Sequence, residues 1–430
     1  MIKKWFLTLS IAERATLLII LAIVIGGIIK SGYYTIHYGG TDLRVRVVGA
    51  RLLNTNHSPY FYKWSQGDPD KFANPNDGNG FTNGVSVAPG ILYLQSVFTF
   101  LDYPLLRIVW TIFQYFLIGY IFLFVLSWTT GPIKNKFYIV LIGSVFFLCS
   151  CLWFINIERG QIYIFYAFLF CVLYQLYTHK NNWSQFAAGI ILGLAIYCRP
   201  TFVVLLIPFI WQFNRSFVAG FIASLIPLSI HAYIHSQLWK DYFSAMAIYT
   251  GLNKPPAYFH NHSYNYPSVI EGAKNLTLYN AMYSCGGIQP IYLYFKSFNA
   301  SYNSIYILIY GLIAFFLTLR FRKNLSNSNP ENAILFGFLL YIITEYIIPF
   351  NRAGYNMMQW VFPVLIILRK INIRKIEFVL LVSGLCLIIS FPYYLPYLHD
   401  IGELILLYCL VNHIKTDHSP GYDINNKILR

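Results

Sequence analysis

Residues 104–128 are PLLRIVWTIFQYFLIGYIFLFVLSW, and this stretch decides the fold class. It holds one charged side chain, Arg107, and exceeds the roughly 20 apolar residues that cross a hydrocarbon core as a helix. Similar apolar runs recur along the chain from Leu17 to Val411. Because a soluble core cannot hide so much apolar surface, the pattern predicts a single membrane-embedded domain over residues 1–430.

The composition supports a membrane protein. Only 11% of the 430 residues are charged, whereas a soluble domain carries about 25%. The net charge is +15, but the basic residues lie in short connections between apolar runs, which argues against nucleic acid as a partner. The N-terminal apolar run continues past Ile29 without a small-residue cleavage site, so we expect no cleavable secretion signal.

The placement of charge predicts the topology. Lys3, Lys4 and Arg14 precede the first apolar run, which puts residues 1–14 in the cytoplasm. The predicted cytoplasmic segments hold 17 Lys and Arg, and the short outer connections hold three. We therefore expect two long loops outside the cytoplasm and a cytoplasmic tail, at residues 35–103, 236–300 and 413–430.

The fold class predicted is an all-α polytopic membrane protein with about 12 transmembrane helices. The run 89–101 is too short for a span and predicts a helix lying at the membrane interface within the first long loop. The expected spans are residues 15–34, 104–128, 137–155, 162–178, 186–198, 201–212, 217–235, 301–319, 332–349, 356–368, 377–394 and 401–412.

The three outer arginines are candidate functional residues. Arg159, Arg199 and Arg352 each lie in a polar cluster at the end of a span. Charges at membrane depth are expensive and are often retained for a site, although a single arginine can also snorkel to lipid headgroups. Two short spans predict a hairpin that turns at Cys198-Arg199-Pro200. Glu345, near the outer end of its span, is expected to pair with Arg352.

Asp42 is the first acidic residue after the first span. Arg44, Arg46 and Arg51 flank it, an arrangement that suits a carboxylate base beside an anion-binding site. Asp42 can equally cap a short helix along the interface, because Thr-Asp before Leu-Arg-Val is a good helix start. Spacing leaves both interpretations open.

Other chemistries have weaker support. His260 and His262 lack a third ligand at useful spacing, so residues around them are expected to form a solvated loop rather than a metal site. The chain has no Walker, GxSxG, HExxH or Rossmann motif in a credible context. No cofactor is predicted, and the need for a divalent ion is left open.

Several short polar and glycine-containing segments occur in a characteristic order along the chain. They are Gly40-Thr41-Asp42-Leu43-Arg44, Arg51-Leu52-Leu53, Ser58-Pro59-Tyr60, Val87-Ala88-Pro89-Gly90-Ile91-Leu92-Tyr93-Leu94, Glu158-Arg159-Gly160-Gln161 and Gly193-Leu194-Ala195-Ile196-Tyr197-Cys198-Arg199-Pro200. Their order, more than any one of them, resembles the GT-C superfamily of membrane glycosyltransferases, and within it glycosyltransferase family 87, the alpha-mannosyltransferase-like group. The resemblance covers roughly residues 15–235. Family members often have Lys where Arg199 stands, and a His-Asp-type cluster where this chain has residues 351–355.

The resemblance implies a GT-C-type architecture and a reaction. A mannose-like hexose would pass, with inversion, from a polyprenyl-phosphate donor to a hydroxyl of a glycan or glycolipid acceptor. Asp42 would be the general base, and Arg199 with Arg159 would hold the donor phosphate. The site would face the periplasm or exterior from a bacterial inner membrane. Substrate contacts are expected from Arg44, Arg46, Glu158, Gln161, Asn156, Arg352 and Tyr355.

Two other function classes stay open. An O-antigen-type polymerase or ligase would carry catalytic Arg and His residues in the loop 236–300, which contains no arginine. A transporter of lipid-linked glycans would show repeated halves with matched broken helices, and no internal repeat is evident.

Overall fold

The computed structural model describes residues 10–72 without 63 and 65, 85–129, 133–249 without 180 and 213, 287–288, 302–326, 330–347, 352–370, 375–389 and 397–416. Within these residues the chain is helical and contains no strand, as the apolar pattern predicts. His260 and His262, and most of the predicted loop 236–300, lie outside the described residues.

In the described part of the chain, three helices are long and apolar enough to cross a membrane on their own. They are α2 (Ile11–His37), α5 (Tyr103–Trp128) and α10 (Arg215–Ile234). In the described residues, the other expected spans also overlap helical segments. Four of these segments are shorter apolar helices, and one is a bent pair: Tyr163–Thr178, Asn182–Cys198, Pro200–Phe209 and Ile376–Ile388, and Lys136–Phe147 with Cys151–Arg159. The chain is therefore an all-helical membrane protein, and a total of about 12 crossings stays a prediction.

The expected span 137–155 is bent rather than straight. It consists of α6 (Ile133–Phe147) and α7 (Cys151–Arg159), which are bent by 54° at the break between them. Ser150 adopts an extended conformation and its hydroxyl donates to the carbonyl oxygen of Phe146. The side chain thus satisfies a terminal carbonyl of α6, and α7 starts in a new direction.

Two further expected spans contain 3₁₀ helix. Residues 201–212 fall on η2 (Pro200–Ile210), in which prolines remove two backbone donors, and residues 356–368 begin as η4 (Gly354–Trp360). The last helix runs to Thr416, a few residues into the predicted tail 413–430. The remaining elements are α3 (Thr41–Leu53), η1 (Asp70–Phe72), α4 (Pro89–Ser96), α8 (Tyr163–Thr178), α9 (Asn182–Cys198), α11 (Ser236–Tyr249), α15 (Tyr302–Ser326), α16 (Pro330–Ile347), α17 (Val361–Lys370), α18 (Ile376–Ile388) and α19 (Tyr397–Thr416).

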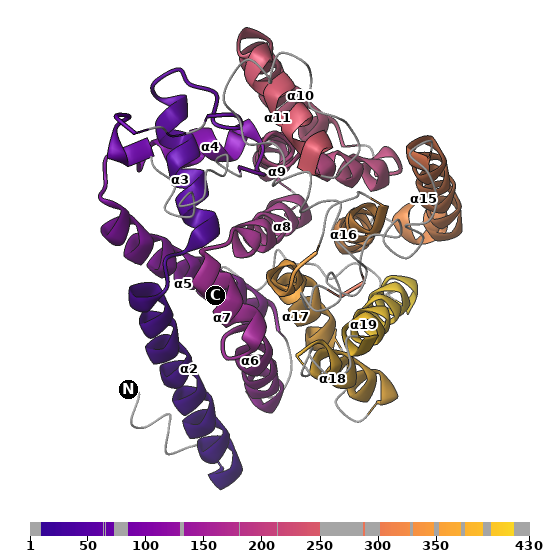
Figure 1. Ribbon diagram of the computed structural model, residues 1–430. Coiled ribbons are helices and arrows are strands. Elements are labelled where there is room, and N and C mark those ends of the chain that lie inside the picture. Colours follow the sequence, from indigo (N-terminus) through magenta and orange to yellow (C-terminus); the bar gives the residue numbers. More distant parts are fainter. Residues whose placement is uncertain are drawn as a thin grey trace.

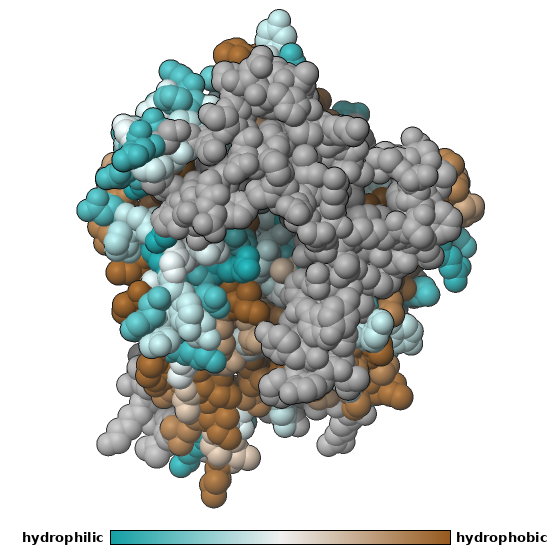
Figure 2. Space-filling view, in the orientation of Figure 1, coloured by the Kyte–Doolittle hydropathy of each residue, from teal (hydrophilic) through white to brown (hydrophobic). Residues whose placement is uncertain are grey.

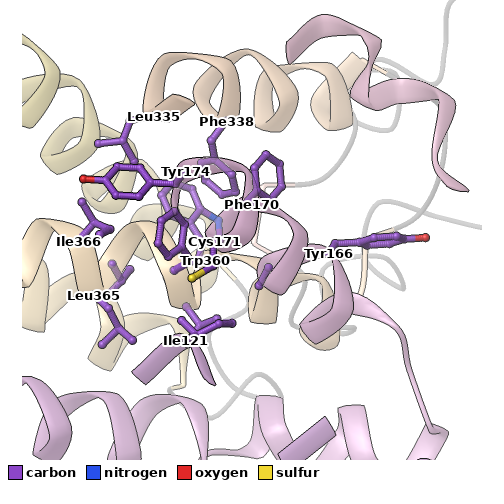
Figure 3. Packing of buried hydrophobic residues seen from close by; sticks show 14 of the residues in the cluster. Ile121, Tyr166, Phe170, Cys171, Tyr174, Leu335, Phe338, Trp360, Leu365 and Ile366 are labelled. Carbon is purple, nitrogen blue, oxygen red and sulfur yellow. The ribbon is translucent and has the colours of Figure 1, made fainter. Parts of the chain in front are cut away.

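Helix α8 lies at the centre of the molecule and packs against α5, α9, α16, α17 and η4 (Figure 1). Its buried residues join those of its neighbours in one large apolar cluster. Figure 3 shows Phe170, Cys171 and Tyr174 of α8 among the labelled apolar side chains, whereas the ring of Tyr166 points away from them. Tyr166 still belongs to this buried cluster, and its ring centroid lies 4.7 Å from the guanidinium carbon of Arg199.

The outer surface is apolar over long stretches. Ile19, Ile29 and Ile36 of α2 and Ile226 and Ile230 of α10 are all exposed. Figure 2 shows hydrophobic residues gathered over the lower part of the view, around α2 and α6, and hydrophilic ones around α3 at the upper left. A lipid-facing lower belt and a water-facing region around α3 account for this division.

Helices α9 and α10 approach each other closely through small residues. A Cβ on Gly189 would lie 2.1 Å from the carbonyl oxygen of Phe217, and one on Gly220 would lie 1.9 Å from that of Phe186. Only glycine fits at both positions without moving a backbone, which is the usual way membrane helices gain contact area.

Helix α16 carries a buried carboxylate near each end, Glu331 and Glu345. They are 14 residues apart, which places them about 21 Å from each other along the helix axis. Each carboxylate is surrounded by donors from other helices. The donors to Glu331 are Tyr174 at 2.6 Å, Arg369 and Lys370 at 2.8 Å, and His413 at 3.0 Å.

Candidate active site

Asp42 lies in the first turn of α3, in the water-facing region of the molecule. The N-cap of this helix is Gly40, and no side chain caps it, so the interpretation of Asp42 as a capping residue is wrong. Asp42 is the acidic residue of the first turn, which is the positive end of the helix dipole. The side chain is free to contact other elements.

The carboxylate of Asp42 receives donors from the end of α7. The Nη1 atom of Arg159 lies 3.4 Å from Oδ2 of Asp42, and the amide of Gln161 donates to the same oxygen. The side chains of Arg159 and Asp42 are 49% and 30% exposed, so the pair is open to a ligand. Arg159 and Gln161, both predicted site residues, thus contact Asp42, which lies more than 100 positions earlier in the chain.

A glycine makes this meeting possible. Gly160 ends α7 with a φ of 66°, and the backbone N–H of Gln161 donates to the backbone carbonyl oxygen of Asn156 at 2.8 Å. This is the Schellman form of helix ending, which reverses the chain within one residue. Arg159, the last residue of α7, and Gln161, just beyond it, consequently both face the start of α3.

A second polar group surrounds Arg199, in the turn between α9 and η2 that the sequence predicts. Its guanidinium forms an ion pair with Glu345 and lies 4.7 Å from the ring centroid of Tyr166 and 5.3 Å from those of Tyr163 and Tyr341. The side chain of Arg199 is 20% exposed, whereas that of Glu345 is almost fully buried. Arg199 is therefore the accessible cation of this group.

Arg352 lies behind Arg199 and is fully enclosed. Its Nε atom is 3.3 Å from Glu345, which confirms the predicted pair. Its two terminal nitrogens donate to both oxygens of Glu403 at 2.7 and 2.8 Å. Glu403 also accepts from the backbone amide of Ile288 at 2.8 Å. Arg352 is thus bound at every side by protein and does not offer a free donor.

Two tyrosines lie between the two polar groups. The ring of Tyr355 is 5.9 Å from the guanidinium carbon of Arg159 and 5.4 Å from the ring of Tyr163. Tyr163 in turn is 5.3 Å from the guanidinium carbon of Arg199. The contacts therefore run without interruption from Asp42 to Arg199, and the two groups form one site.

The other residues expected near Asp42 differ in exposure. Arg44 is partly exposed and stacks 4.9 Å from the ring centroid of Tyr103. Arg46 is buried and donates to the carbonyl oxygen of Gly160, and burial lowers the pKa of its guanidinium. Arg51 points elsewhere, because it donates to the carbonyl oxygens of Lys71 and Leu101.

The polar residues at the end of α7 differ in their surroundings. Asn156 is fully buried, and its amide donates to the side chain of Gln114 rather than facing the site. Glu158 is partly exposed, one residue from Arg159. In the described part of the chain, no group of three His, Cys, Asp or Glu side chains is placed to hold a metal ion.

Two buried charged residues of this region are not among the residues that the sequence predicts for the site. Arg107 of α5 and Glu403 of α19 are charged residues inside apolar stretches, and both are buried. The rule that membrane-embedded charges mark sites applies to them as it does to Arg199. The signal is present in the sequence, but it must be sought within spans as well as at their ends.

Comparison with known families adds an independent observation. The family described as glycosyltransferase family 87 matches residues 88–343, more than half of the chain. Arg159, Gln161 and Arg199 lie inside the matched part, and Asp42 precedes it. A search of curated proteins finds no match.

Proposed function

The chain belongs to glycosyltransferase family 87, and from this premise we propose that it transfers a mannose-like hexose from a polyprenyl-phosphate donor to a glycan or glycolipid hydroxyl. The reaction would proceed with inversion on the extracytoplasmic face of the membrane. For a bacterial inner membrane, this is the periplasmic face. The resemblance between the motifs and family 87 is confirmed by the family match.

The observation that carries the proposal is the pairing of a carboxylate and an accessible cation within one site. Asp42 accepts two donors at the exposed end of the site, and Arg199 lies beyond the two tyrosines. A displacement at a sugar carbon needs both: a base for the attacking hydroxyl and a positive charge for the leaving phosphate.

The steps follow from these positions. The acceptor oxygen attacks the anomeric carbon while its proton passes to Asp42. The bond from that carbon to the phosphate oxygen breaks on the opposite side, and polyprenyl phosphate leaves with the electron pair. Arg199 stabilises the charge on the departing phosphate, with Arg159 as the second cation.

The remaining residues divide by exposure. Arg44, Glu158 and Tyr355 are partly exposed beside Asp42 and Arg159, and they are the proposed contacts for acceptor and sugar. Gln161 holds Asp42 through its side-chain amide. Three predicted contact residues are buried and would act through neighbours: Arg46, Asn156 and Arg352.

The test is transfer of radiolabelled hexose by the purified chain in lipid nanodiscs. We expect labelled product when the donor is a polyprenyl-phosphate hexose and none when the same sugar is supplied as its nucleotide. Product from the sugar nucleotide alone would disprove the donor assignment. No product with a panel of polyprenyl-phosphate hexoses and glycolipid acceptors would favour a polymerase or a transporter.

Arg199→Gln tests the phosphate assignment. Removal of a preorganised cation is expected to lower kcat/KM about 10²–10³-fold. Glu345 keeps Arg352, Tyr341 and Gln359 as partners, so the variant should still fold. Arg215→Gln, at the opposite end of α10 from the site, is the matched control and should retain near wild-type kinetics. Equal kcat/KM in Arg199→Gln and wild type would remove Arg199 from the mechanism.

A further inference from the structure

Arg107 is a buried cation without a buried anion to match it. It is the single charged residue in the apolar stretch 104–128, and it is 3% exposed. It forms no ion pair with any carboxylate in the described residues. A charge held this way costs free energy unless other groups compensate it, so its contacts indicate what it does.

Carbonyl groups at the ends of two helices provide the compensation. The Nε atom of Arg107 donates to the carbonyl oxygen of Thr35 at 2.8 Å, and Nη2 donates to those of Tyr34 and Glu158 at 3.0 Å. Tyr34 and Thr35 belong to the last turn of α2, and Glu158 to the last turn of α7. The carbonyl oxygen of Tyr34 also accepts from the backbone N–H of Tyr38 at 3.1 Å. All three carbonyls lie in the last turn of a helix, at the negative end of its dipole, where a cation is stabilised.

Arg46 binds the same end of α7 from the other side. It projects from α3, is 3% exposed, and donates to the carbonyl oxygen of Gly160. Its guanidinium carbon also lies 5.9 Å from the ring centroid of Trp110, one turn along α5 from Arg107. Two buried guanidinium groups, from α3 and α5, therefore hold the residues that flank Arg159.

We propose that Arg107 and Arg46 are positioning residues that hold the C-terminal end of α7, and with it Arg159 and Gln161, against Asp42. The inference rests on the proposed function for its kinetic consequence, but the mechanical link between α5, α3 and α7 stands apart from it. Neither arginine touches the substrate. Their effect is transmitted through the backbone from Glu158 to Gln161.

This role has a distinct kinetic signature. A displacement of about 1 Å in a catalytic arrangement can cost about 10²-fold in rate. Loss of Arg107 should therefore lower kcat by a much larger factor than it raises the KM for the polyprenyl-phosphate donor, because Arg199 still binds the phosphate while the displaced Arg159 acts on the charge that builds in the transition state. Lysine keeps the charge but lacks the planar fork that reaches two helix ends at once, so Arg107→Lys should recover only part of the activity.

The experiment combines kinetics with hydrogen exchange on the full chain in nanodiscs. Arg107→Met is expected to lose about 10²-fold in kcat and to exchange faster in the peptide covering residues 151–161. Arg51→Met is the matched control, because Arg51 lies on α3 and binds loop carbonyls away from α7. If Arg107→Met does not accumulate, Arg46→Met carries the same expectations.

Each outcome of this experiment either supports or overturns the positioning role of Arg107. Faster exchange with unchanged kcat would reduce Arg107 to a structural role and overturn the proposal. A raised donor KM with unchanged kcat would make it a binding residue, and unchanged exchange would show that it does not hold α7. If the wild type transfers no sugar, the proposed function fails, and the exchange of residues 151–161 alone then supports or overturns the link.

Discussion

Asp42→Asn is expected to reduce hexose transfer by about 10²–10⁴-fold while the protein accumulates normally, because the amide keeps the shape of the side chain but cannot accept the proton of the acceptor hydroxyl. The loss should appear in kcat and in kcat/KM together, as expected for an interaction realised only in the transition state. Donor-dependent transfer in nanodiscs, at matched protein concentration, measures it.

Asp70→Asn is the matched control. Asp70 is an exposed aspartate in η1, in the same predicted water-facing loop, and takes no part in the site. Its replacement should leave transfer near the wild-type rate. Full activity in Asp42→Asn would move the base elsewhere, and Glu158, the partly exposed carboxylate next to Arg159 in the chain, would be the next residue to test.

Glu403→Gln should produce the largest loss of stability. Glu403 is fully buried and binds both terminal nitrogens of Arg352, while Trp360 donates to it at 3.0 Å. Without the charge of Glu403, Arg352 keeps the carboxylate of Glu345, which it shares with Arg199. The loss should therefore approach the roughly 3–5 kcal/mol that breaking a buried ion pair costs. Thermal unfolding in detergent should show a clearly lower midpoint than in the wild type.

A double variant distinguishes the loss of one charge of the Arg352–Glu403 pair from the loss of both. Arg352→Met combined with Glu403→Leu removes both charges and should be more stable than Glu403→Gln alone. Glu377→Gln, which loses only a half-buried contact with Asn412, should shift the midpoint little. A Glu403→Gln midpoint equal to that of the wild type would contradict the pairing.

Much of this architecture is predictable from local sequence. The apolar runs predict helices wherever the structure describes the chain, and Cys198-Arg199-Pro200 predicts the turn because proline cannot donate a backbone hydrogen bond. The pair of Glu345 and Arg352 is also predictable, since the two residues are close in sequence and both are embedded charges.

The rest depends on contacts between distant segments. Glu403 accepts hydrogen bonds from both terminal nitrogens of Arg352, and it lies 51 positions away in another helix. The bend between α6 and α7 depends on how Ser150 is used, which hydropathy alone does not reveal. Asp42 is recognisable as a candidate, but only the fold brings Gln161 to its carboxylate.

The two carboxylates of α16 have a consequence for how the protein is made. In the predicted topology, this helix enters the bilayer with Glu331 and Glu345 as it leaves the ribosome, and unpaired carboxylates oppose partitioning into lipid. Tyr174 and Arg199 are synthesised before it, but Arg352, Arg369 and His413 follow it. Stable insertion of α16 therefore waits for the C-terminal helices, and chains that end before them should be recognised as incomplete and degraded by membrane quality control.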